Sequence, residues 1–266
     1  MVYQEGVTPT SGITLVNPDG TGNLPLLNDG FQNESPAVSP DGMRVAFIST
    51  KPGHLALYVM SSEGTSITLL APQLSHAGEP SWSPDGTRIV FLASRQDSLG
   101  INSEVAIINA DGSNFHYLTH NFDWDGSPSW SPDGSKILFT SQEGPDGIYV
   151  MDTTGANRVQ IPGTTGFDQR AKWSPDGARI AFHSLRDGNW EIYSMLANGT
   201  DVQRLTTNAA NDWDPAWSPD GSKIIFESDR SGGQFRLWTI TAADGSNPSS
   251  PLGALAARPH WAREPR

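Results

Sequence analysis

The chain has 266 residues and a formal net charge of −12 at pH 7. This acidic balance argues against a nucleic-acid backbone or an anionic membrane surface as the main partner, because both repel negative charge. Cysteine is absent, which excludes a disulfide framework, a thiolate metal site and a cysteine nucleophile. No window approaches the roughly 18 apolar residues of a membrane span, so no membrane insertion is predicted.

Three short segments rich in β-forming residues open the chain, at residues 1–4 (MVYQ), 12–16 (GITLV) and 23–27 (NLPLL). After them, one pattern recurs to the end of the chain at intervals of 43 to 48 residues. A fixed period of this length indicates a repeat architecture. One position anchors the pattern and is called the Trp column here. Its occupants in successive copies are Val38, Trp82, Trp130, Trp173, Trp217 and Trp261.

Each copy is predicted to begin with a β-hairpin. In the first five copies the Trp column is followed by Ser-Pro-Asp-Gly, as in Ser83–Gly86, and then by a strand such as RIVF or KILF. Pro presets φ for a type I turn, Asp suits the next position, and Gly takes the left-handed position after it. We therefore interpret these Asp residues as turn formers. A third strand such as EVAII, a glycine-containing turn and a short fourth strand follow.

The two ends of the chain together complete one more copy. The last copy, RPHWAREPR, supplies a single strand, and the three opening segments fill the remaining strand positions. We predict an all-β fold, a six-bladed β-propeller with four antiparallel strands per blade, whose last blade is shared between the N- and C-termini. Residues 1–266 then form a single β-propeller domain. Sharing a blade removes the exposed edges of an open stack of sheets.

The recurring motif PxWSPDGxxIxF, with text such as HSLRDGNWEIYSM at His183–Met195, resembles the repeat of TolB-like propellers, which are relatives of WD repeats. The resemblance implies a six-bladed propeller. TolB itself couples to a lipoprotein of the outer envelope, so the resemblance implies protein binding and a periplasmic or extracellular location, with a cytoplasmic one kept as an alternative. The additional N-terminal domain of TolB is not expected, because residue 2 already begins a blade. Similar repeats occur in peptidase gates, lyases and sensors, so the fold implies less about function.

The position three residues before the Trp column differs in charge between copies, unlike the turns. Its occupants are Ser35, Glu79, Ser127, Arg170, Asp214 and Arg258. Their neighbours include Asp125, Asp168, Lys172, Asp212 and His260. We expect these residues to ring the mouth of the central channel, on the face opposite the Ser-Pro-Asp-Gly turns, where a ligand would bind. The alternative interpretation is a solvated ring of charges that neutralise one another.

Two loops add a tryptophan beside carboxylates, Trp124 in NFDWDGSP and Trp213 in NDWDPAW. An exposed tryptophan there suits stacking on a sugar or anchoring a protein partner. Alternatively, each indole covers the gap between two blades. The predicted partner-binding residues are therefore Glu79, Trp124, Asp125, Arg170, Lys172, Trp213, Asp214, Arg258 and His260.

No cofactor or metal ligand is predicted. Asp123, Asp125 and Ser127 imitate the start of an EF-hand loop, but the glycine at position 6 and the acid at position 12 are missing. Asp212 and Asp214 form a similar acidic pair. Calcium at the channel mouth is kept as an alternative.

The chain lacks the G-x-S-x-G, H-E-x-x-H and phosphate-loop motifs, so no catalytic residue is predicted. The first hypothesis is a non-catalytic binding module, a monomer or a domain of a larger chain, that presents a charged, Trp-bearing channel mouth to a protein or glycan partner. The alternative is a polysaccharide lyase-like enzyme acting on an acidic saccharide. In that enzyme Arg170, Lys172 and Arg258 would clamp the substrate, and His260 would act as the base.

Overall fold

The Ser-Pro-Asp-Gly segments form closely similar turns in the computed structural model, which describes residues 1–266 except 6–9, 18, 98–99, 251–255 and 262–266. In the second copy, the Ser83 hydroxyl donates to the Asp85 carboxylate and accepts the Arg88 N–H. Gly86 has a φ of +68°, which glycine adopts without strain. The hydrogen bonds from the Ser83 hydroxyl and the Thr87 N–H lower the pKa of Asp85 to about 2. The turn aspartates are thus engaged by their own turns, as the sequence predicts.

Each turn joins the first two strands of a small antiparallel sheet, and five such sheets follow one another along the chain. Blade 1 comprises β4 (Asn33–Val38), β5 (Arg44–Ser49), β6 (Ala56–Ser61) and β7 (Thr68–Leu69). Blade 2 comprises β8 (Ala77–Trp82), β9 (Arg88–Asp97), β10 (Gly100–Asn109) and β11 (His116–Tyr117). Blade 3 comprises β12 (Asp125–Trp130), β13 (Lys136–Ser141), β14 (Gly147–Asp152) and β15 (Val159–Gln160). Blade 4 comprises β16 (Asp168–Trp173), β17 (Arg179–Ser184), β18 (Glu191–Leu196) and β19 (Gln203–Arg204). Blade 5 comprises β20 (Asp212–Trp217), β21 (Lys223–Ser228) and β22 (Arg236–Thr241).

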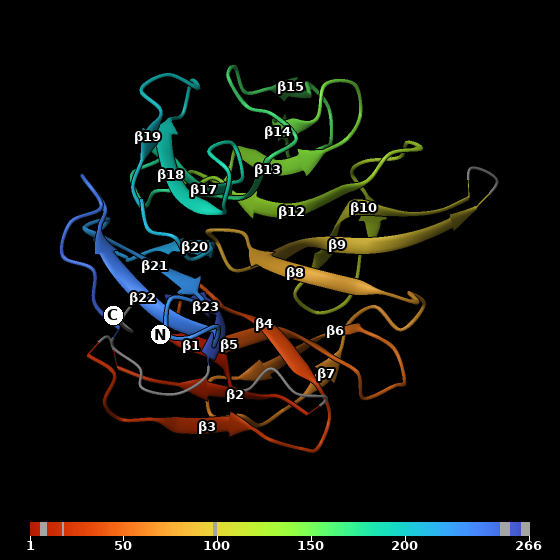
Figure 1. The fold of residues 1–266 in the computed structure, drawn as a ribbon. Helices are drawn as coiled ribbons and strands as arrows, with labels where there is room; N and C mark the ends of the chain where they lie inside the picture. The colour runs from red at the N-terminus through yellow and green to blue at the C-terminus, as the bar shows by residue number, and fades with distance from the viewer. Residues whose placement is uncertain (6–9, 18, 98–99, 251–255, 262–266) are drawn as a thin grey trace.

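The sixth blade is shared between the two ends of the chain, which confirms the predicted six-bladed ring. It comprises β23 (Ala256–His260), β1 (Val2–Glu5), β2 (Gly12–Leu15) and β3 (Leu24–Leu27). The C-terminal strand β23 is innermost and pairs with β1 (Figure 1). In the described residues blade 5 has three strands, with a single bridge between Thr239 and Ser249 beside β22.

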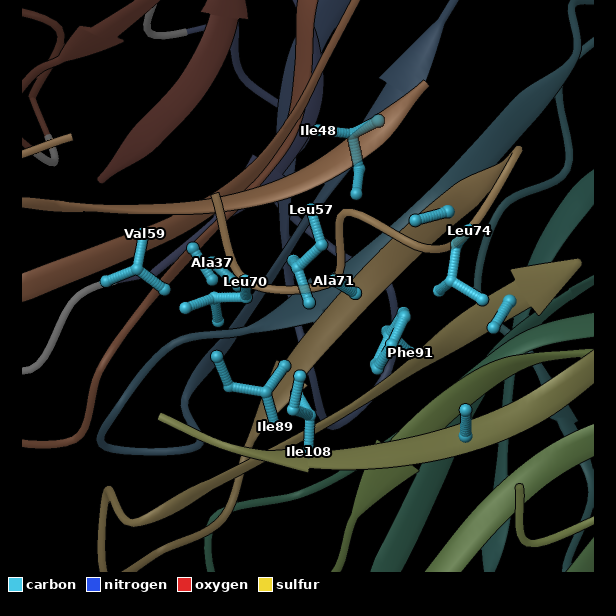
Figure 2. Close-up of a cluster of buried hydrophobic side chains, with 14 of the residues drawn as sticks. Ala37, Ile48, Leu57, Val59, Leu70, Ala71, Leu74, Ile89, Phe91 and Ile108 are labelled. Atoms are coloured by element: carbon cyan, nitrogen blue, oxygen red, sulfur yellow. The ribbon is translucent and has the colours of Figure 1, made fainter. Parts of the chain in front are cut away.

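The hydrophobic core is divided into sectors that lie between neighbouring blades. Six clusters of buried side chains are found among the described residues, and each joins two adjacent blades. Figure 2 shows the cluster between blades 1 and 2, where Ile48 and Leu57 face Ile89 and Phe91. Burying one such side chain contributes roughly 1.5–3 kcal/mol. The apolar faces of every blade are therefore covered only when the ring is closed.

The innermost strand of each blade has one edge free, and these edges surround the central channel. Proline stands two residues before the Trp column in five of the six inner strands, for example Pro80 in β8 and Pro215 in β20. Proline lacks an N–H, so it suits a strand edge that has no partner. The described residues form strands, turns and bends, and contain no helix long and apolar enough to cross a membrane.

Candidate functional site: the central channel

A bulge in every inner strand turns one side chain toward the channel. The pairing of β12 with β13 shifts register between Gly126 and Ser129, and the other inner strands show equivalent shifts. The residue three before the Trp column has a φ of 50–57° in all six strands, at Ser35, Glu79, Ser127, Arg170, Asp214 and Arg258. A left-handed backbone is costly for such residues and is often found where function requires a particular side-chain direction. These six residues, called the channel column here, therefore share one unusual backbone conformation.

Five members of this column, four of them charged, meet at one end of the channel, which is called the charged end here. A cavity of about 70 Å³ at this end is lined by Glu79, Arg170, Asp214 and Arg258. Ser35, Lys172, His260 and the neighbouring prolines complete its lining. Of the predicted partner-binding residues, six are thus gathered in one place.

The two arginines of the charged end are paired with carboxylates. Arg170 Nη2 lies 2.8 Å from Glu79 Oε1 of blade 2, and its Nε lies 3.4 Å from Asp214 Oδ1 of blade 5. Arg258 Nη1 lies 2.9 Å from Glu34 Oε1 and donates to the Ser35 hydroxyl at 2.6 Å. The Arg170 guanidinium therefore links blades 2, 4 and 5 around the channel. The Arg258 guanidinium links blades 6 and 1.

Two further ionisable groups support this end, and sequence reasoning missed both. His183 Nδ1 accepts the Asp214 N–H at 3.1 Å, and burial lowers the pKa of His183 to about 4. Glu227 accepts the Arg258 N–H, and burial together with the Asp214 charge raises the pKa of Glu227 to about 8. Both residues directly follow the recurring Phe of the second strand. Blades 1 and 2 have the apolar residues Ile48 and Leu92 at this position. The change to an ionisable residue is the signal that could have identified His183 and Glu227.

The opposite end of the channel opens into a cavity of about 240 Å³, called the funnel here. Its walls are the tryptophans Trp82, Trp130, Trp173, Trp217 and Trp261, and its rim is formed by the turn prolines Pro40, Pro84, Pro132, Pro175 and Pro219. Pro80, Lys172, Pro259 and His260 line both the funnel and the charged-end cavity, so the two cavities meet at these residues. Sequence reasoning missed the funnel because repeated residues build it.

Trp124 and Asp125 lie at the start of the inner strand of blade 3, and neither lines the charged-end cavity or the funnel. Trp124 lines a groove of about 390 Å³ with Gln142 of blade 3 and Gln169 of blade 4. Its ring packs against the Gly126 backbone, where an added Cβ would lie 2.6 Å away. Asp125 is fully buried and accepts a hydrogen bond from Asn121 Nδ2 at 2.8 Å, and burial raises the pKa of Asp125.

Trp213 and Asp212 are also held by their own blade. The Trp213 ring lies 5.3 Å from the Phe235 ring, centroid to centroid, and is half-buried. Asp212 is fully buried and pairs with Arg230 at 2.6 Å, as Asp168 does with Arg186 in blade 4. Neither tryptophan lines the channel cavities described above.

The acidic residues suggested for calcium face different partners. Asp125 is bonded to Asn121, Asp212 to Arg230, and Asp214 to Arg170. Across the part of the chain that the structure describes, no group of three or more His, Cys, Asp or Glu side chains is placed to hold a metal ion. The calcium alternative therefore has no preformed ligand set in these residues.

The fold has many relatives among solved structures. TolB from Acinetobacter baumannii is 24% identical with a TM-score of 0.82, over 98% of this chain and 65% of that protein. Putative TolB from Agrobacterium tumefaciens is 22% identical with a TM-score of 0.81, over 98% of this chain and 95% of that one. An oligogalacturonate lyase from Vibrio parahaemolyticus is 14% identical with a TM-score of 0.63, over 94% of this chain and 73% of that one. At these identities the likeness shows the fold alone.

The chain thus spans about two thirds of the length of the Acinetobacter TolB. No curated protein matches the sequence. A family model does match, over residues 20–101 and 87–264, and its description is "TolB beta propeller domain". These matches cover most of the chain and contain the motif copies that build the blades. The chain belongs to the TolB β-propeller domain family.

Proposed function

We propose that the protein is a non-catalytic binding module whose charged end recognises a segment of a protein partner that carries both acidic and basic side chains. One observation carries the proposal. Glu79, Arg170, Asp214 and Arg258 come from four blades and line one cavity at the end of the channel. The bulged backbone gives each side chain a fixed direction.

Charge exchange explains how such a site would work. Arg170 holds Glu79 and Asp214 in the free protein, so an incoming acidic side chain replaces a carboxylate that is already paired. Exchange of this kind adds little net affinity, but it rejects partners with the wrong charge pattern. We therefore expect modest affinity and strict dependence on the order of charges in the partner segment.

Selection of linear peptides from a random display library tests the proposal. The variant E79Q/R170Q/D214N removes both partners of each central ion pair, so none of these three residues is left as a charge without its partner. Peptides selected on the unmodified protein should share a mixed charge pattern and lose at least tenfold in affinity on this variant. The matched control is R179M, which breaks the partly exposed Arg179–Asp201 pair of blade 4. Peptides that bind the triple variant equally well would refute the proposal.

The glycan partner has less support than the protein partner. Sugar stacking was expected of Trp124 and Trp213, and both rings are packed against their own chain. Two of the three cations that the lyase alternative uses as a clamp, Arg170 and Arg258, are each paired with a carboxylate. Formation of an unsaturated product from acidic polysaccharides would revive it. A periplasmic or extracellular location remains part of the proposal, and fractionation of the native source tests it.

A further inference from the structure

Two basic side chains lie at the inner end of the funnel, which is called its floor here. They stand at a sequence position where the other blades have a small side chain. The residues directly before the Trp column are Ala37, Ser81, Ser129, Lys172, Ala216 and His260. Only blades 4 and 6 place a long, nitrogen-bearing side chain there, with Ala216 of blade 5 between them along the ring. Lys172 and His260 both line the funnel.

The Lys172 ammonium differs from the arginines of the charged end because it has no partner. Within the described part of the chain, its Nζ forms no hydrogen bond and no ion pair, whereas Arg170 contacts two carboxylates. Burial lowers the pKa of Lys172, and the Arg170 charge acts in the same direction. Glu79 and Asp214 oppose this from the charged end, but both are already paired with Arg170. A desolvated cation without a partner is stabilised by an incoming anion.

His260 adds polarity to the floor without adding charge. Its Nδ1 accepts the Val38 N–H at 3.4 Å, so the neutral ring carries its proton on Nε2. Burial lowers the pKa of His260 to about 4, which keeps the ring neutral near pH 7. Above this floor the walls are indole and proline rings. The funnel is therefore a cavity with apolar walls and one cation, Lys172, at its floor.

We infer that the funnel binds a carboxylate carried on an apolar body, with the carboxylate paired to Lys172 and the apolar part against the tryptophan walls. Two sources share this chemistry, the C-terminal residue of a protein segment and a small carboxylic acid. A volume of about 240 Å³ suits one or two residues or a small acid rather than a larger ligand. The inference concerns the cavity opposite the proposed protein-binding site, which it meets at Lys172 and His260, and it does not depend on that site.

Titration followed by tryptophan fluorescence tests this inference, since five of the wall residues are tryptophans. The probes are acetyl-Ala-Phe with a free C-terminus, its C-terminal amide, 3-phenylpropionate and 3-phenylpropionamide. The free acids should bind, and each amide should bind at least tenfold more weakly because the ion pair to Lys172 is lost. Tighter binding of the peptide acid identifies a chain terminus as the source, and tighter binding of phenylpropionate identifies a small molecule.

Variants locate the binding. K172M should weaken binding of the acids at least tenfold, and K172R should restore most of it. K223M is the matched control, because Lys223 is an exposed lysine at the start of β21, next to a turn of the same face. Thermal melts establish that each variant is folded. Equal affinity for acid and amide, unchanged affinity in K172M, or failure of both acids to bind the unmodified protein would overturn the inference.

Discussion

The two ends of the channel are built from the same six inner strands, yet they differ in how their charges are balanced. At the charged end, Arg170 and Arg258 are each paired with carboxylates of other blades. In the funnel, the walls repeat from blade to blade, and Lys172 stands without a partner in the described structure. One strand type thus provides a network of ion pairs on one side and, where the two cavities meet, a cation that forms no ion pair in the described structure.

This difference shows where a repeat protein can place its specificity. The backbone position three before the Trp column has the same φ in all six blades, whatever side chain occupies it. The chain can therefore change the charge there without changing the blade. The funnel walls are tied to blade packing, for example by the Trp82 indole, which donates to the Ala37 carbonyl of the neighbouring blade at 2.9 Å. In the funnel, the charge of the lining side chains varies between blades only at the floor, at the residue directly before the Trp column.

The largest effect is expected from removing the strand that contributes to both ends. A chain ending at Ala256 loses most of β23, and with it Arg258, His260 and the pairing to β1. Its free energy of unfolding should fall by more than ~4 kcal/mol, because blade 6 loses its innermost strand. A chain ending at Trp261 keeps β23 and is the control. Equal melting temperatures for the two truncated chains, measured by circular dichroism, would show that β23 does not close the ring.

The second prediction compares the paired and unpaired cations directly. R170M leaves Glu79 and Asp214 without their cation, in a site where the three side chains are 27%, 12% and 19% exposed. It should lower the free energy of unfolding by about 2 kcal/mol. K172M removes a desolvated cation without a partner, so it should change stability by less than ~0.5 kcal/mol. Urea unfolding measures both, and a K172M variant as unstable as R170M would remove the distinction between the two ends.

The third prediction concerns the pH dependence of the charged end. Glu227 has its pKa raised from 4.5 to about 8, so the folded protein holds this proton over a range where the unfolded chain releases it. The corresponding stability is fully present below pH 4.5 and is lost as pH rises through about 8. Between pH 6.5 and 8 stability should fall by about 1 kcal/mol per pH unit.

The variant E227Q isolates this group, because it cannot ionise. Its stability should no longer fall as pH rises from 6.5 to 8, since the N-terminal ammonium, whose pKa burial lowers, contributes only an increase in this window. The buried His183 and the half-buried His260 have their pKa lowered to about 4, so their stabilising contribution is lost as pH falls below 6.5, outside this window. An E227Q variant with the same pH profile as the unmodified protein would assign the titration to another group.

The smallest effect is expected at the rim of the funnel. Asp133 is bonded within its own turn to the Ser131 hydroxyl and the Ser135 N–H, and these bonds lower its pKa to about 2. D133N should lower stability by no more than ~1 kcal/mol and leave binding of carboxylate probes unchanged. A change in probe affinity would show that the rim takes part in binding.

The fold could be predicted from the sequence because its determinants are local and repeated. The Ser-Pro-Asp-Gly turn, the Trp column and the following Phe determine each hairpin, and the last copy RPHWAREPR with the three opening segments indicates the shared blade. The channel column was predicted for the same reason, since one position recurs in every copy. The six residues of that column have the same backbone geometry.

The surroundings of the column were harder to predict. Asp212 and Asp214 are two apart, which in a regular strand places both on one face. The bulge interrupts this alternation, so Asp214 lines the channel while Asp212 is buried against Arg230. His183 and Glu227 come from the second strands, and their approach to Asp214 and Arg258 depends on how adjacent blades pack. No local pattern encodes that packing.

The most direct test of the account is a crossed binding measurement on the two ends. One probe is a mixed-charge peptide selected on the unmodified protein, and the other is 3-phenylpropionate. Each is titrated against E79Q/R170Q/D214N and against K172M. Because Lys172 lines both cavities, the account predicts that the acid loses affinity on K172M and keeps it on the triple variant, whereas the peptide loses affinity on the triple variant. Loss of acid binding on the triple variant, or unchanged peptide binding there, would contradict the division of the channel into two separate sites.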